Sequence, residues 1–167
     1  METEARIADD LTWRWHDNVI YGLRFERGDP DVHDWRSELV LDIDFIVEWL
    51  CRTPGDVQYK VAPATLTFHD VTDLGITVQQ ADSDGRNALF EWSIDRVERQ
   101  RLARPMDYWR WTIHLHDPPG GTLAFCASGF SEVQRAEPLL IHEQRLPRSA
   151  RGTNRLFRLD PCDRVCA

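Results

Sequence analysis

The chain has 167 residues, of which 28 are acidic and 20 are basic, and 42% are hydrophobic. This length and composition predict one globular domain with a hydrophobic core, and they exclude collagen-like, low-complexity and disordered chains. The formal net charge of −8 argues against a nucleic-acid-binding protein that works by neutralising phosphates. No stretch approaches the roughly 18 consecutive apolar residues of a membrane helix, and the acidic segment METEARIADD lacks the features of a secretory signal. We therefore expect a cytoplasmic protein that binds neither nucleic acid nor membrane.

Hydrophobic residues alternate with polar residues along most of the chain, as in antiparallel strands that have one face on a core. The longest alternating run is ELVLDIDFIVEW, in which Leu39, Leu41 and Ile43 point to one face. Asp42 and Asp44 point to the other face, which we expect to be solvated. Shorter alternating runs cover residues 19–25, 64–68, 74–78, 90–94, 109–115 and 122–127. The pattern predicts a mainly β fold of about seven to eight strands, an antiparallel sandwich or a partly open barrel with little helix.

The domain organisation is simple. We expect one β-rich domain over residues 10–144, in which residues 96–104 and 131–142 are the only candidates for helices. Residues 145–167 carry six Arg and two Asp, and they predict a basic C-terminal tail that is either disordered or packed on the domain.

A His-x-His pair is the best candidate for metal chemistry. On a strand, His114 and His116 point to the same face, and Asp42 and Asp44 would complete a two-His, two-carboxylate site if their strand lay nearby. One divalent metal such as zinc would then support a small metal-dependent hydrolase or a metal-binding protein. The alternative is a solvated polar sheet face with no cofactor, and we favour this alternative.

The aromatic residues near the first turn suggest a binding surface instead. Trp13, Trp15 and Trp35 lie in the sequence close to Asp31 and Asp34, and tryptophan is enriched at the centres of protein interfaces. These residues predict an acidic, Trp-bearing surface for a basic protein partner. The alternative interpretation is that the tryptophans cap the open ends of the sandwich.

Motifs for other chemistry are absent from the sequence. There is no G-x-S-x-G nucleophile elbow, and the turn DPPGG matches neither type of glycine-rich phosphate loop. The sequence therefore favours a protein that is not an enzyme.

Four segments carry a resemblance: WRWHDNVIYGLRF (13–25), LVLDIDFIVEW, VAPATLTFHDVTDL (61–74) and YWRW. Together they resemble a family of bacterial single-domain proteins of unknown function that share a V-A-P-A-T-L-x-F segment and a D-x-D-[FY] strand. The resemblance implies a domain of this size and no particular activity. The first strands are also similar to small immunity proteins of bacterial toxin systems.

These observations together predict a non-catalytic cytoplasmic binding module for a basic protein partner, with an immunity role as its sharpest form. A homodimer through an edge strand is a further expectation, because open sheets leave unpaired edges.

Overall fold

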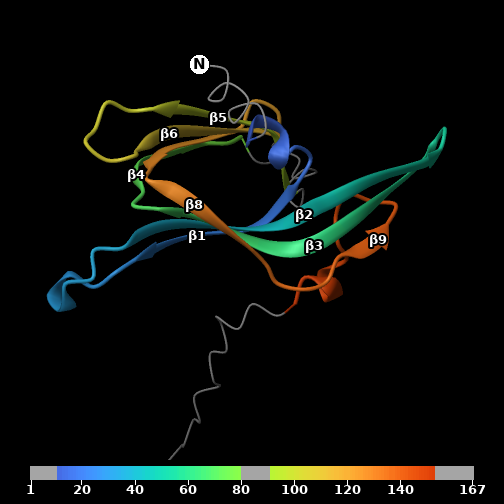
Figure 1. Cartoon of the computed structure of the whole chain (residues 1–167), viewed down its shortest axis with the longest axis horizontal. Coiled ribbons are helices and arrows are strands. Elements are labelled where there is room, and N and C mark those ends of the chain that lie inside the picture. The colour runs from blue at the N-terminus through green and yellow to red at the C-terminus, as the bar shows by residue number, and fades with distance from the viewer. Residues whose placement is uncertain (1–10, 80–90, 153–167) are drawn as a thin grey trace, which may run out of the picture.

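The computed structural model describes residues 11–79 and 91–152, which form nine strands, one helical turn at residues 11–14 and two short 3-10 helices (Figure 1). The strands are β1 (Val19–Arg27), β2 (Ser37–Thr53), β3 (Asp56–His69), β4 (Thr72–Thr77), β5 (Trp92–Arg101), β6 (Trp109–Asp117), β7 (Thr122–Ala127), β8 (Gly129–Gln134) and β9 (Leu139–Ile141). The 3-10 helices are η1 (Pro30–Val32) and η2 (Arg148–Ala150). The prediction of a mainly β fold with little helix is confirmed.

All strand pairs are antiparallel, and the sheet runs in the order β4-β7-β6-β5-β1-β2-β3-β8, with β9 also paired to β3. The chain passes from β3 to β4 and from β7 to β8 at two sharp bends. The bends lie against each other, because the Ser128 N–H donates to the His69 carbonyl at 3.0 Å. In contrast, β1 and β5 are paired over only two residues of each strand. The sheet therefore curls back on itself at the bends and remains a partly open barrel between β1 and β5.

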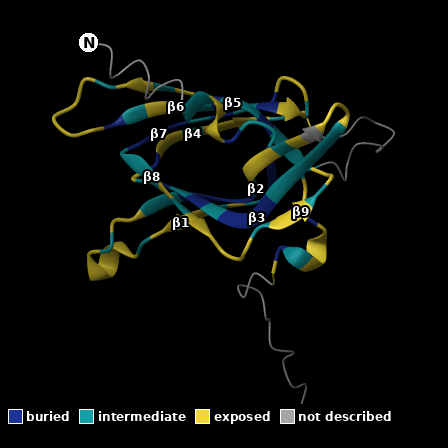
Figure 2. Cartoon of the chain, turned by 45° about the vertical axis from the view of Figure 1, so that its right-hand side comes forward, coloured by how far each residue is buried: buried dark blue, intermediate teal, exposed yellow. Residues whose placement is uncertain are grey.

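One hydrophobic core fills the inside of this barrel. The strand alternation puts Leu39, Leu41 and Ile43 of β2 into it, all fully buried. Phe68 of β3 lies among aromatic rings and meets Phe125 at a centroid distance of 4.6 Å in an edge-to-face arrangement. Such pairs contribute about 0.5–1.5 kcal/mol beyond the burial of their surface. Figure 2 shows the central parts of β2 and β3 in the colour of buried residues.

Two segments that the sequence marks as helix candidates are strands. Residues 96–104 lie mostly in β5, and residues 131–142 contain most of β8 and all of β9. The helix interpretation is wrong because these segments carry polar side chains on both faces of the strand, which removes the period-two pattern. Likewise β2 and β3 extend well beyond the predicted runs as a long hairpin that projects from the barrel (Figure 1).

The start of the C-terminal segment packs on the outer face of the sheet. Leu146 is buried against Ile46 and Val61 of the β2–β3 hairpin. Arg151 is only 7% exposed and reaches back to β2. Residues 145–152, which the sequence assigns to a basic tail, thus form part of the folded body, whereas residues 153–167 lie outside the described residues. We call residues 139–152 the C-terminal strap.

Candidate binding surface

The five residues predicted to bind a partner do not form one surface. Trp15 is fully buried, and its indole N–H donates to Glu132 at 2.7 Å. Its ring meets Phe130 edge-on at a centroid distance of 5.0 Å, so it belongs to the core. The prediction that Trp15 lies on a binding surface is therefore wrong, because the helical turn that precedes it directs its side chain into the barrel.

Trp13 is 59% exposed, but it lies far from the other three residues. It belongs to the helical turn at residues 11–14, which lies over the barrel, whereas the β1–β2 hairpin ends at the far left of Figure 1. Asp31, Asp34 and Trp35 all belong to that hairpin end. We call residues 28–36 the β1–β2 tip.

Local hydrogen bonds hold the β1–β2 tip in one conformation. The carboxylate of Asp29 accepts the Asp31 N–H at 2.9 Å and caps η1, where Pro30 occupies the first turn. The guanidinium of Arg36 donates to Asp34 at 2.7 Å, and the Gly28 N–H donates to the Arg36 carbonyl at 2.8 Å. These contacts close the loop on itself without help from the barrel.

Gly28 is required for this closure. A Cβ atom at Gly28 would lie 2.4 Å from atoms of Asp34, which is much closer than any real contact. The Asp34 carboxylate can therefore bridge the neck of the tip only because residue 28 has no side chain.

The β1–β2 tip presents two large hydrophobic side chains to solvent. Val32 is 72% exposed and Trp35 is 74% exposed. Figure 2 shows the tip in the colour of exposed residues. Exposed aromatic side chains on a pre-ordered loop are typical of protein-binding surfaces, because little conformational entropy is lost when they are covered.

The surroundings of the tip are acidic. Residues 26–38 contain five acids and two arginines. Hydrogen bonds from Arg36 lower the pKa of Asp34, so this carboxylate stays ionised in mildly acidic solution. The side chains of Asp29 and Asp31 are exposed to solvent. Neither forms an ion pair with the residues that the structure describes. The tip therefore combines negative charge with exposed apolar surface.

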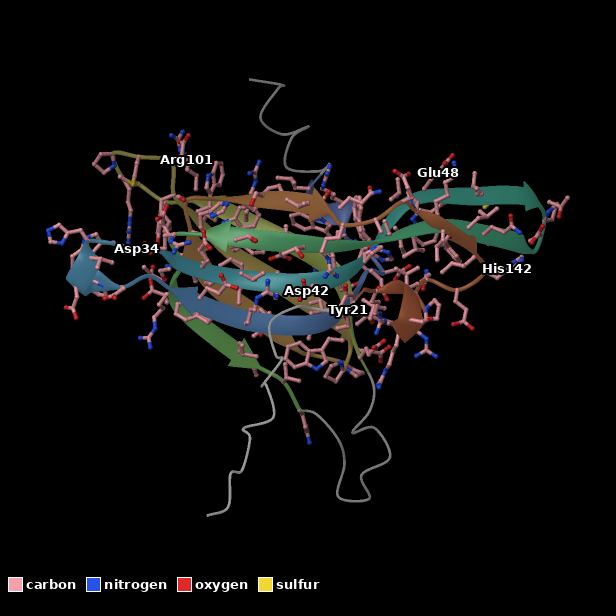
Figure 3. The ribbon with its side chains drawn as sticks, turned by 90° about the horizontal axis from the view of Figure 1, so that it is seen from below. Tyr21, Asp34, Asp42, Glu48, Arg101 and His142 are labelled. Carbon is pink, nitrogen blue, oxygen red and sulfur yellow. The ribbon has the colours of Figure 1, made fainter. Side chains whose placement is uncertain are left out.

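The two carboxylates of the predicted metal site are buried. Asp42 accepts hydrogen bonds from Arg24 at 2.7 Å and from Thr65 at 2.9 Å. Asp44 accepts from Arg151 at 2.7 Å and from the Leu146 N–H at 3.0 Å. Figure 3 shows Asp42 and Tyr21 together on this outer face. The strand alternation does put both aspartates on the outer face, but the expectation that this face is solvated is wrong there.

The physical reason is the C-terminal strap. It covers Asp44, and Arg151 bridges Asp44 and Glu91. Burial raises the pKa of Asp44, although the hydrogen bonds and charge of Arg151 oppose this rise. Burial also raises the pKa of the neighbouring Tyr21 to about 12. Arginine thus occupies the position beside Asp44 where the metal-site alternative would place an ion.

The histidines of the predicted metal site lie elsewhere. His114 and His116 are on β6, which is separated from β2 by β5 and β1 in the sheet. His114 lies 3.4 Å from Glu98 on the adjacent strand. In residues 11–79 and 91–152, no group of three or more His, Cys, Asp or Glu is close enough to hold a metal ion. The structure therefore does not bring Asp42, Asp44, His114 and His116 into one site.

Two open hollows of about 590 and 610 Å³ flank the C-terminal strap. They share Glu91, His142, Glu143 and Arg145 in their walls. Arg145 lies 3.5 Å from Glu143, and Glu91 is paired with Arg151. Three of the charged groups that the two walls share, Glu91, Glu143 and Arg145, therefore lie in ion pairs.

The sequence interpretation overlooked a second charged end, formed by β5, β6 and the loop between them. Residues 99–110 contain four arginines and one aspartate, interleaved with Tyr108 and Trp109. The signal was present as four arginines close to Tyr108 and Trp109. It was missed because residues 96–104 carry polar side chains on both faces and show no clear period.

In comparisons with known proteins, no protein-family model, no curated protein and no solved structure matches the chain. No helix among the described residues is long and apolar enough to cross a membrane. The resemblance to a bacterial family, the cytoplasmic location, and the homodimer through an edge strand stay predictions.

Proposed function

We propose that this protein is a non-catalytic binding module whose β1–β2 tip engages a basic protein partner. The observation that carries the proposal is the exposure of Trp35 and Val32 on a loop that its own hydrogen bonds keep rigid. A protein surface of this kind buries an aromatic anchor on binding and surrounds it with polar contacts.

The charge of the tip selects the partner. Asp29 and Asp31 lie beside the apolar side chains, and Glu26 and Glu38 lie on the strands that lead to the tip. Such a surface attracts a basic partner and repels an acidic one, and the attraction weakens as salt screens it. The most specific version of this proposal is an immunity-like role in the cytoplasm. In that role the module covers a basic toxin-like protein.

The test uses a fluorescein-labelled, end-blocked peptide of six lysines, titrated with the protein at low salt and followed by fluorescence anisotropy. We expect Trp35→Ala to weaken binding at least five-fold, because truncation of an interface aromatic costs more than about 1 kcal/mol. Trp13→Ala is the matched control, since Trp13 is also exposed but lies outside the tip. Equal affinity of the wild-type and Trp35→Ala proteins would contradict the proposal, as would a larger loss in Trp13→Ala.

A further inference from the structure

Arginine side chains stack on aromatic rings at the end of the molecule formed by β5 and β6. The guanidinium carbon of Arg99 lies 4.4 Å from the ring centroid of Trp109 and 5.7 Å from that of Trp111. Arg104 lies 4.3 Å above the ring of Tyr108 in the same way. A guanidinium stacked on a ring keeps its N–H groups at its rim, where they can donate to an acceptor in the same plane.

Unlike Arg96 and Arg101 on the same strand, Arg99 has no acidic partner among the described residues. Arg96 pairs with Glu98 at 3.0 Å, and Arg101 pairs with Asp107 at 2.6 Å. Arg99 is half-buried, and burial alone lowers its pKa, yet an arginine stays charged at neutral pH. A half-buried charge without a counter-ion is unfavourable, so a bound anion would stabilise it.

A second donor lies next to Arg99. Trp111 is fully buried, and its indole N–H has no hydrogen-bond partner in the described part of the chain. Its strand pairs with β5 so that Trp111 is directly opposite Arg99. Buried donors are nearly always satisfied, so the indole N–H of Trp111 is a second donor in this region that lacks an acceptor among the described residues.

We propose that Arg99, stacked on Trp109, binds a carboxylate of an acidic segment in a partner protein. A carboxylate fits because its two oxygens match the paired N–H groups of a guanidinium. The site is separate from the β1–β2 tip and takes the opposite charge, so it does not depend on the function proposed for the tip.

The charge of the chain argues for a protein carboxylate over a nucleic acid. The formal net charge is −8, whereas binding through phosphates needs a surplus of cations that neutralise several of them. Figure 3 places Arg101, on the same strand as Arg99, at the end of the molecule opposite His142, and Arg101 is already paired with Asp107. One guanidinium is sufficient for one carboxylate, and no row of unpaired cations is needed.

The test is a titration of ¹⁵N-labelled protein with an end-blocked peptide of six glutamates, followed by the indole N–H resonances in NMR spectra. The chain has seven tryptophans, and each resonance is assigned by its loss in a Trp→Phe variant. We expect the resonances of Trp109 and Trp111 to shift and Arg99→Met to weaken binding at least ten-fold. Arg148→Met is the matched control, because Arg148 lies on η2 in the C-terminal strap, and we expect wild-type affinity from it.

Arg99→Lys keeps the charge but loses the planar donor group, and we expect it to bind at least three-fold more weakly than the wild type. Wild-type affinity in both Arg99 variants overturns the proposal, and so do shifts that spare Trp109 and Trp111. A six-nucleotide uridine RNA that binds more tightly than the glutamate peptide also overturns it, in favour of a nucleic-acid site.

Discussion

Two groups of aspartates from the same stretch of sequence have opposite roles in this protein. Asp31 at the β1–β2 tip faces solvent, whereas Asp44 of β2 is fully buried and paired with Arg151. Both belong to the run of acids between residues 26 and 48, and the sequence predicts that both lie on solvated surface. What separates them is the C-terminal strap, which covers one group and leaves the other free.

A charged residue on the outer face of a strand is therefore not by that position alone a binding residue. A carboxylate is available to a partner only where nothing in the chain already satisfies it. Asp44 attaches the C-terminal strap to the sheet, and Asp42 is hydrogen-bonded to Arg24 on the neighbouring strand. Asp31 at the tip is exposed and has no such partner among the described residues.

Arg151→Met tests the buried group. We expect it to lower the free energy of unfolding by about 3 kcal/mol, because it leaves the buried carboxylate of Asp44 without its partner. Urea unfolding measures the change. The matched control, Arg148→Met in the same strap, is expected to change stability by no more than about 0.5 kcal/mol.

The pH dependence of Arg151→Met has a definite sign. Burial already raises the pKa of Asp44, and loss of Arg151 raises it further. A raised pKa in the folded state favours the protonated form. The loss of stability caused by Arg151→Met is therefore smallest in acid and grows as the pH rises through the raised pKa. A deficit that does not change with pH would show that Asp44 is not the group left unpaired.

Gly28→Val tests the neck of the tip. The new side chain would overlap Asp34, so we expect a loss of about 1–2 kcal/mol in stability and a loss of binding to the six-lysine peptide. Gly129→Ala is the control, since a Cβ atom there meets nothing within 4 Å. Unchanged binding by Gly28→Val would show that the conformation of the tip is irrelevant to recognition.

Asp31→Asn tests the free acids. We expect binding to the six-lysine peptide to weaken two- to five-fold at low salt, with stability unchanged to within about 0.5 kcal/mol. Anisotropy titrations at several salt concentrations should also show a shallower salt dependence than in the wild type. A large loss of stability in this variant would place Asp31 with the structural acids instead.

Arg36→Gln has the smallest expected effect. Hydrogen bonds from Arg36 lower the pKa of Asp34, so the variant should return that pKa toward its ordinary value, as NMR titration of the carboxyl resonance would show. A lowered pKa in the folded state stabilises the fold above the ordinary pKa, and this contribution is lost as the pH falls. The wild type and the variant should therefore differ least in stability in acid.

The alternation of hydrophobic and polar residues was sufficient to predict the β class and the core positions of β2 and β3. It could not reveal β9 or the strap, because a three-residue strand and a covering segment leave no periodic signal. The same limit decides which candidate site residues could be predicted to be exposed or buried. Trp35 and Asp31 were predictable from a turn-rich segment that had to be exposed, whereas the burial of Trp15, Asp42 and Asp44 depends on residues more than one hundred positions away or on neighbouring strands.

The most direct test of recognition by the β1–β2 tip is to titrate ¹⁵N-labelled protein with the six-lysine peptide and follow the indole N–H resonances of the protein. If the tip contacts the basic peptide, we expect the resonance of Trp35 to shift at low salt and to return as salt is added, while the resonances of Trp13 and Trp15 stay in place. A shift at Trp13 with Trp35 unmoved would contradict it, because the acidic tip would then not be the surface that a basic partner contacts.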